Sequence, residues 1–167
     1  MIDAIKYFFL EIVGREWSVF LCSMLPIIEL RGAIPFGFAL DMPWYQAYIL
    51  AVLGNIIPVP FILLFIRKIL NAMEKSKVKF FNKFAGFLHS KAEKNRVKIE
   101  KYSFWGVCLF VAIPLPVTGA WTGSLVAALI DMKFWKAFLS AVIGVLIAGA
   151  IVTIIMYGGA EFLSWLI

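Results

Sequence analysis

The sequence predicts an all-α integral membrane protein with an inverted repeat. Each half is expected to be a re-entrant helical hairpin plus a spanning helix, with amphipathic helices on the cytoplasmic side. Hydrophobic residues make up 63% of the 167 positions, more than soluble domains contain. The 50 residues from Trp17 to Ile66 carry only three charges. Such a run needs a bilayer, because a chain of this length cannot build a core large enough to bury it.

We expect one membrane domain over residues 1–167. Its first segment alternates apolar and charged residues with a helical period and is too short to span, which predicts an interfacial helix. The expected segments are this helix at 1–16, repeat one at 17–70, a basic cytoplasmic linker at 71–101, repeat two at 102–157 and a tail at 158–167.

Glu29 and Arg31 are expected at membrane depth, where ionisable groups are costly and commonly functional. Residues 17–40 could cross the bilayer as one helix, or could form a hairpin whose two limbs reach the midplane and return. Closely spaced Pro and Gly favour the hairpin, because they interrupt a helix. The interruptions expected here are Pro26, Gly32 and Pro35.

The first spanning helix is expected to start at Asp41, which can cap a helix, and to run to about Leu70. Pro58 and Pro60 should kink it and free backbone carbonyls. Asn55 stands just before these prolines, where it could satisfy broken backbone or contact a substrate.

The linker is strongly basic. Eleven of the 16 Lys and Arg lie between Arg67 and Lys101, which places this segment in the cytoplasm. Its phenylalanines recur at helical spacing, so we expect a helix that lies either on anionic lipid or against the protein's own helices. Because the apolar flanks demand a membrane, no nucleic-acid partner is expected.

Repeat two begins with an uncharged segment, residues 102–130. Its expected interruptions are Pro114, Pro116, Gly119 and Gly123. Three of its side chains could line a wall opposite Glu29: Thr118, Trp121 and Thr122. A last helix is expected from Asp131 to about Tyr157.

The two halves are related by a shift of 90 residues. Residues 41–54 match residues 131–144 at six of 14 positions. A hairpin plus one crossing in each half would make an inverted-topology repeat, which in transporters places the substrate site near the midplane between broken helices. Two full crossings in each half would instead give a four-span bundle. The charge rule does not choose between these topologies, and the density of Pro and Gly favours hairpins.

The stretches Glu-Leu-Arg-Gly-Ala-Ile-Pro (29–35) and Pro-Leu-Pro-Val-Thr-Gly (114–119) resemble those of the small multidrug export protein family. The resemblance covers nearly the whole chain. More distantly, the chain is similar to the DedA (VTT-domain) superfamily. That similarity implies two oppositely oriented re-entrant hairpins, an acidic residue at Glu29 and, as in some members, flipping of lipid carriers such as undecaprenyl phosphate. The superfamily usually has an arginine in its second hairpin, whereas here Arg31 lies in the first.

The site residues suggest transport. Glu29 could take up and release a proton, while Arg31 could hold an anionic group or balance Glu29; alternatively, the two form a structural pair. We expect a secondary transporter or flippase, multi-pass in the plasma (inner) membrane, that moves a small amphiphilic or lipid-linked, anionic substrate and is proton-coupled through Glu29. The alternatives are a four-span drug efflux protein and a non-transporting membrane scaffold.

Other partners follow from composition. The sequence offers neither a nucleophile–base pair nor a metal cluster, so an enzyme, a cofactor and a metal are not expected. Membrane lipid is an expected partner. A homodimer is plausible, because two hairpins and two crossings make a thin wall around any cavity.

Overall fold

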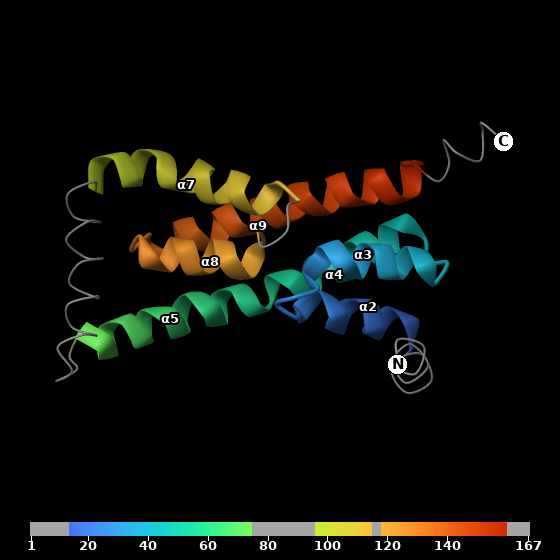
Figure 1. The fold of residues 1–167 in the computed structure, drawn as a ribbon, viewed down its shortest axis with the longest axis horizontal. Coiled ribbons are helices and arrows are strands. Elements are labelled where there is room, and N and C mark those ends of the chain that lie inside the picture. The colour runs from blue at the N-terminus through green and yellow to red at the C-terminus, as the bar shows by residue number, and fades with distance from the viewer. Residues whose placement is uncertain (1–13, 75–95, 115–117, 160–167) are drawn as a thin grey trace. The chain divides into compact units, whose positions relative to one another are not determined.

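The described part of the chain is helical throughout, as the sequence predicts. The computed structural model describes residues 14–74, 96–114 and 118–159 (Figure 1). The predictions for residues 1–13, for 75–95 of the linker, for Pro116 and for 160–167 of the tail lie outside these ranges. In chain order the helices are α2 (Arg15–Met24), α3 (Glu29–Ala39), α4 (Trp44–Ile56), α5 (Pro58–Glu74), α7 (Arg96–Ala112), α8 (Ala120–Leu129), α9 (Phe134–Thr153) and the π-helix η1 (Ile154–Gly158).

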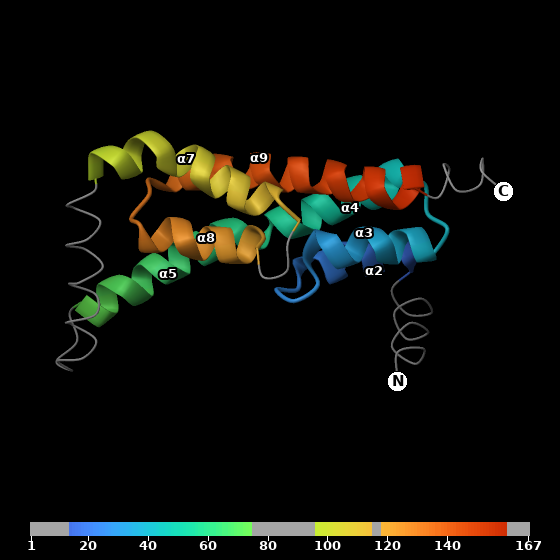
Figure 2. The same cartoon turned by 45° about the horizontal axis from the view of Figure 1, so that its top comes forward.

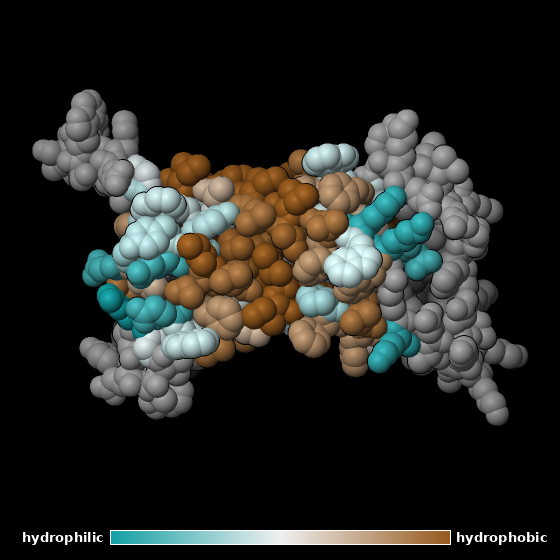
Figure 3. Space-filling model, turned by 180° about the vertical axis from the view of Figure 1, so that it is seen from behind, coloured by the Kyte–Doolittle hydropathy of each residue, from teal (hydrophilic) through white to brown (hydrophobic). Residues whose placement is uncertain are grey.

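Two helical stretches are long and apolar enough to cross a membrane. Trp44–Ile66 has a mean hydropathy of 2.6 and Phe134–Gly158 one of 2.7. Both expose large hydrophobic side chains, among them Leu53, Phe61 and Leu139. Hydrophobic residues also make up a large part of the coloured surface in Figure 3. Soluble proteins rarely expose large apolar surfaces, so this surface suits lipid.

The first of these stretches is interrupted at Ile57, just before the predicted proline kink. Helix α4 ends at Ile56 and α5 begins at Pro58, because a proline nitrogen cannot donate a helical hydrogen bond. Pro60 lies in the first turn of α5, where backbone N–H groups need no intrahelical partner. Helix α5 then continues to Glu74, beyond the predicted end at Leu70.

The chain divides into two compact units, which are described separately. Unit 1 comprises Met1–Ile57 and Val145–Ile167, and unit 2 comprises Pro58–Gly144. The helix pair α2–α3 belongs to unit 1 and the pair α7–α8 to unit 2. Each of the two long apolar stretches contributes one part to each unit.

In unit 1, α2 and α3 form a helical hairpin that packs against α4 (Figures 1 and 2). A single helix over residues 17–40 is therefore the wrong alternative, because α2 ends at Met24 and the chain turns at Pro26. Pro26 is an interruption as predicted. Gly32 and Pro35 are not, since both lie inside α3, where the fully buried Ala33 and Ile34 fix the helix by packing.

In unit 2, α8 packs against both α5 and α7. Pro114 follows the end of α7 and Gly119 directly precedes α8, as the predicted interruptions require. Gly123 was also expected at the break, but it lies inside α8. There a Cβ atom would overlap Val111 of α7, so this glycine serves close helix packing.

The repeated segments share one turn. Asp41 and Asp131, 90 residues apart, both have left-handed backbone, with φ of 53° and 52°. In each turn a methionine N–H closes the preceding helix, from Met42 to the Gly37 carbonyl at 3.1 Å and from Met132 to Ala127 at 3.0 Å. Asp41 was expected to cap α4, and this is wrong, because α4 begins after Pro43 without a side-chain cap. Its short polar side chain instead tolerates the left-handed turn.

Two glycines at equivalent positions let the spanning helices approach the hairpins closely. A Cβ atom at Gly54 would overlap the Phe20 carbonyl and the Ser23 hydroxyl of α2. A Cβ at Gly144 would lie 2.8 Å from the Cys108 carbonyl and 2.6 Å from the Val111 side chain of α7. Each hairpin is thereby packed on its helix backbone to backbone.

Replacing either glycine by alanine should lower the free energy of unfolding by about 1–3 kcal/mol, because the added methyl forces the helices apart. Thermal unfolding in detergent measures this. Gly106→Ala in α7 is the matched control, since no atom lies within 4 Å of its Cβ position. It should be neutral or stabilise by up to about 1 kcal/mol. Equal effects at all three positions would contradict the close approach.

Candidate functional site

Glu29 occupies an unusual backbone position at the start of α3. Its φ is 50°, in the left-handed region that glycine normally fills, and its N–H donates to the Leu25 carbonyl at 2.9 Å. The residue is only 6% exposed. A left-handed non-glycine residue costs about 1–2 kcal/mol, and such strain tends to gather at functional sites. The turn therefore holds a carboxylate inside the protein at some cost.

Arg31 accompanies Glu29 in the first turn of α3. It is half-buried, and the carboxylate of Glu29 attracts its guanidinium electrostatically. Glu29 and Arg31 are the two charged residues of the stretch from Trp17 to Ala39.

Asn55 is the third predicted site residue in unit 1. It follows Gly54, which packs on the last turn of α2, so it lies level with the end of the hairpin's first limb. Its side chain is fully buried, and neither its Oδ1 nor its Nδ2 has a hydrogen-bond partner among the described residues. Leaving such a group unpaired costs about 1–3 kcal/mol, so the amide is suited to a water or a ligand.

Two predicted residues of unit 2 have their hydroxyls bonded to nearby backbone. Thr118 donates to the Ile113 carbonyl at 2.8 Å, just beyond the end of α7. Thr122 donates to the Gly119 carbonyl at 3.4 Å, at the start of α8. Both hydroxyls are therefore bonded within unit 2, one just beyond the end of α7 and one at the start of α8.

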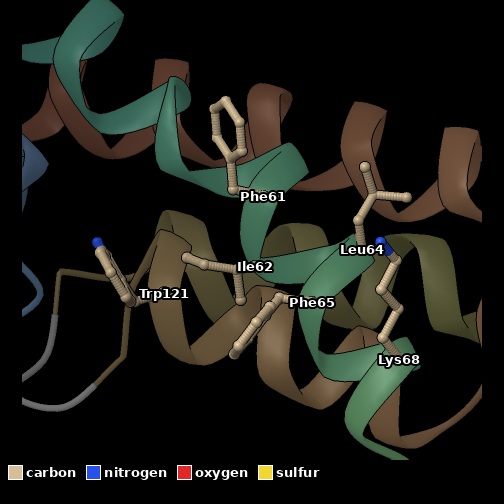
Figure 4. A pocket seen from close by; sticks show the side chains of 6 residues that line it. All are labelled: Phe61, Ile62, Leu64, Phe65, Lys68 and Trp121. Atoms are coloured by element: carbon tan, nitrogen blue, oxygen red, sulfur yellow. The ribbon is translucent and has the colours of Figure 1, made fainter. Parts of the chain in front are cut away.

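Trp121, the remaining predicted residue, lines a pocket of about 420 Å³ between α8 and α5. Figure 4 shows Trp121 at one end and Lys68 at the other, with apolar side chains between them. The pocket thus combines an apolar wall with one ammonium group. The analysis of the sequence missed Phe61, Phe65 and Lys68, although their spacing of four and three residues places them on one helix face.

The predicted site residues thus form two groups, one in each unit. Glu29, Arg31 and Asn55 belong to unit 1, and the three residues of α8 and its preceding turn belong to unit 2. The expected meeting of Glu29 with a wall of threonines stays a prediction.

Two apolar stretches of spanning length, together with the buried Glu29 and the half-buried Arg31, indicate a helical membrane protein with ionisable groups in its apolar segments. The chain belongs to the family described as "Putative small multi-drug export protein", whose sequence model matches residues 29–151, well over half of the chain. The matched segment begins at Glu29 and includes both groups of site residues. Neither the curated proteins nor the solved structures give a match. The wider similarity to the DedA superfamily stays a prediction.

A double-mutant cycle should detect the interaction of Glu29 with Arg31. The substitutions Glu29→Gln and Arg31→Gln, alone and combined, should give a coupling free energy of about 0.5–3 kcal/mol, because removing one charge removes the other's partner. The measurement is unfolding in detergent. Glu16→Gln combined with Arg31→Gln is the control, because Glu16 is exposed in the first turn of α2. The effects of these two substitutions on the free energy of unfolding should be additive to within about 0.5 kcal/mol. Additivity of the Glu29 cycle would contradict the pairing.

Proposed function

We propose that this chain is a multi-pass protein of the plasma (inner) membrane that transports or flips a small amphiphilic or lipid-linked, anionic substrate, with Glu29 as its proton-binding group. The observation that carries the proposal is the burial of the Glu29 carboxylate at an interrupted hairpin. A carboxylate can change its charge by binding a proton, whereas a guanidinium cannot. Ionisable residues inside apolar segments mark ion and proton pathways.

We also propose that α2–α3 and α7–α8 are re-entrant hairpins that enter from opposite sides. Helices α2 and α3 have 10 and 11 residues, which is too short to cross a bilayer. Tyr157, near the end of the second span, donates to the Met42 carbonyl at 3.0 Å, and its ring contacts that of Phe38 at 5.0 Å. These contacts support a topology in which the first span begins where the second ends. A four-span bundle would place these points on opposite sides of the membrane.

The pocket beside Trp121 supports an anionic amphiphile as cargo. Its lining is apolar except at Lys68, so an apolar tail could lie along α5 while an anionic group meets the ammonium. Arg31 offers a second cation, within unit 1.

A non-transporting scaffold is the second candidate, and the attraction between Glu29 and Arg31 favours it. A carboxylate in the first turn of a helix also has favourable electrostatics without any transport role. On this alternative the charged pair shapes the hairpin, and neutralising Glu29 should cause misassembly.

Cysteine accessibility at equivalent positions of the repeat should separate the two topologies. Pro43 and Lys133 are both exposed and lie 90 residues apart, immediately before α4 and α9. In a chain lacking Cys22 and Cys108, a membrane-impermeant thiol reagent should label Pro43→Cys from outside and Lys133→Cys only from the cytoplasm. Labelling of both from one side would exclude the hairpin topology.

Glu29→Gln should reduce transport to the rate of protein-free liposomes while the protein stays folded, because glutamine keeps the shape but cannot bind a proton. The measurement is the transfer of a fluorescent phosphatidylglycerol across proteoliposome membranes under an imposed pH gradient. Folding is checked by gel filtration and circular dichroism.

Glu16→Gln is the matched control for this substitution, since Glu16 is exposed in the first turn of α2. It should leave the transfer unchanged. Normal transfer by Glu29→Gln would remove Glu29 from the mechanism, and a misassembled Glu29→Gln protein would favour the scaffold.

A further inference from the structure

A second pocket lies in unit 1, and its lining residues belong to α4, α9 and η1. It has a volume of about 390 Å³ and lies between the first turns of α4 and the end of α9 with η1. Figure 2 shows these helix ends side by side. The lining includes Trp44 and Tyr48 from α4, Thr153 from α9, and Ile154 and Tyr157 from η1.

Thr153 is the unusual group in this pocket. Its side chain is 7% exposed, and its hydroxyl has no hydrogen-bond partner among the described residues. The buried serines of the described helices behave differently, because each bonds a carbonyl three or four residues earlier. These are Ser18, Ser23, Ser124 and Ser140. A hydroxyl left unpaired against a pocket indicates a ligand that completes it.

The two tyrosine hydroxyls of the pocket wall are already bonded. The Tyr157 hydroxyl donates to the Met42 carbonyl at 3.0 Å, and the Tyr48 hydroxyl donates to the Leu146 carbonyl at 3.2 Å. These bonds fix the two rings as a wall, and the Thr153 hydroxyl is the hydroxyl of the lining that stays unpaired among the described residues. Thr153 also immediately precedes the π-helix η1, and π-helical turns occur frequently at functional sites.

The depth of Thr153 points to the chemistry of the ligand. The span Phe134–Gly158 has 25 residues, about 38 Å of helix against about 30 Å of hydrocarbon. Thr153 lies five residues from its end, between one and two helical turns away. Its hydroxyl is therefore near the boundary between acyl chains and headgroups. Trp44 and Tyr157 fit the aromatic belt of that zone.

We propose that this pocket binds one membrane phospholipid, whose ester carbonyl accepts a hydrogen bond from the Thr153 hydroxyl. Ester carbonyls of phospholipids lie at this boundary, and a carbonyl is the acceptor that the hydroxyl lacks. One acyl chain lies along the exposed Ile154, while the aromatic side chains flank the glycerol region. This site is independent of the proposed transport function and would exist in a scaffold as well.

The test measures the unfolding temperature of delipidated protein in detergent, with and without dioleoylphosphatidylglycerol. A ligand that binds only the folded state raises this temperature. Wild-type protein should show a clear rise, and its ether-linked analogue, which lacks the ester carbonyls, should give a smaller one. Equal rises with the ester and ether lipids would overturn the proposal.

Thr153→Val tests the protein side of the same bond. Valine has the same shape, so without lipid this variant should unfold at the wild-type temperature or above, because it removes an unpaired buried hydroxyl. With the ester lipid its rise should fall to that of the ether lipid. A full rise in Thr153→Val, or a loss of stability without lipid, would overturn the proposal.

Ser140→Ala is the control on the same helix, since the Ser140 hydroxyl already donates to the Ala137 carbonyl. It should keep the full rise with lipid. Ala150→Leu fills the pocket and should lose the rise; if it does not fold, Thr153→Val decides the matter alone. The transfer assay with Glu29→Gln is a separate measurement, so failure of one proposal leaves the other standing.

Discussion

The structure depends on one constraint: helices as short as α2, α3 and α8 end among apolar residues and need their backbone groups satisfied. In the re-entrant topology proposed above, water could not reach these ends, so the protein itself has to bond them. In unit 1, the Ser23 hydroxyl donates to the Phe20 carbonyl in the last turn of α2. In unit 2, the Thr118 hydroxyl donates to the Ile113 carbonyl just beyond α7. One hydroxyl at each turn thus helps to end a helical limb.

Small residues hold the hairpins against the long helices. Gly54 and Gly144 allow the long helices to touch hairpin backbone, and alanines at equivalent positions of the two repeats are fully buried. These alanines are Ala47 and Ala51 in α4, and Ala137 and Ala141 in α9. In lipid there is little hydrophobic force between helices, so such close contact supplies much of their association. The charged pair at Glu29 and Arg31 stands on a hairpin held in this way.

Much of this arrangement can be predicted from the sequence, because it follows from composition and repetition. Apolar run lengths predict the two long helices, and the match between residues 41–54 and 131–144 predicts two similar turns. Glycine and proline are less informative. Pro26 breaks a helix whereas Pro35 lies within one, and only the packing of Ala33 and Ile34 separates the two cases. The unpaired hydroxyl of Thr153 was also beyond prediction, since the sequence analysis did not predict the π-helical turn that follows it.

The division of the chain into units has a consequence for synthesis. Unit 1 combines Met1–Ile57 with Val145–Ile167, so the ribosome makes all of unit 2, Pro58–Gly144, before it starts the second part of unit 1. The Met42 carbonyl accepts its hydrogen bond from the Tyr157 hydroxyl, which is synthesised 115 residues later. Contacts between such distant segments form slowly, because a long loop must close first. The first hairpin is therefore made well before η1, and Phe38 of α3 lacks its ring contact with Tyr157 until η1 has been synthesised.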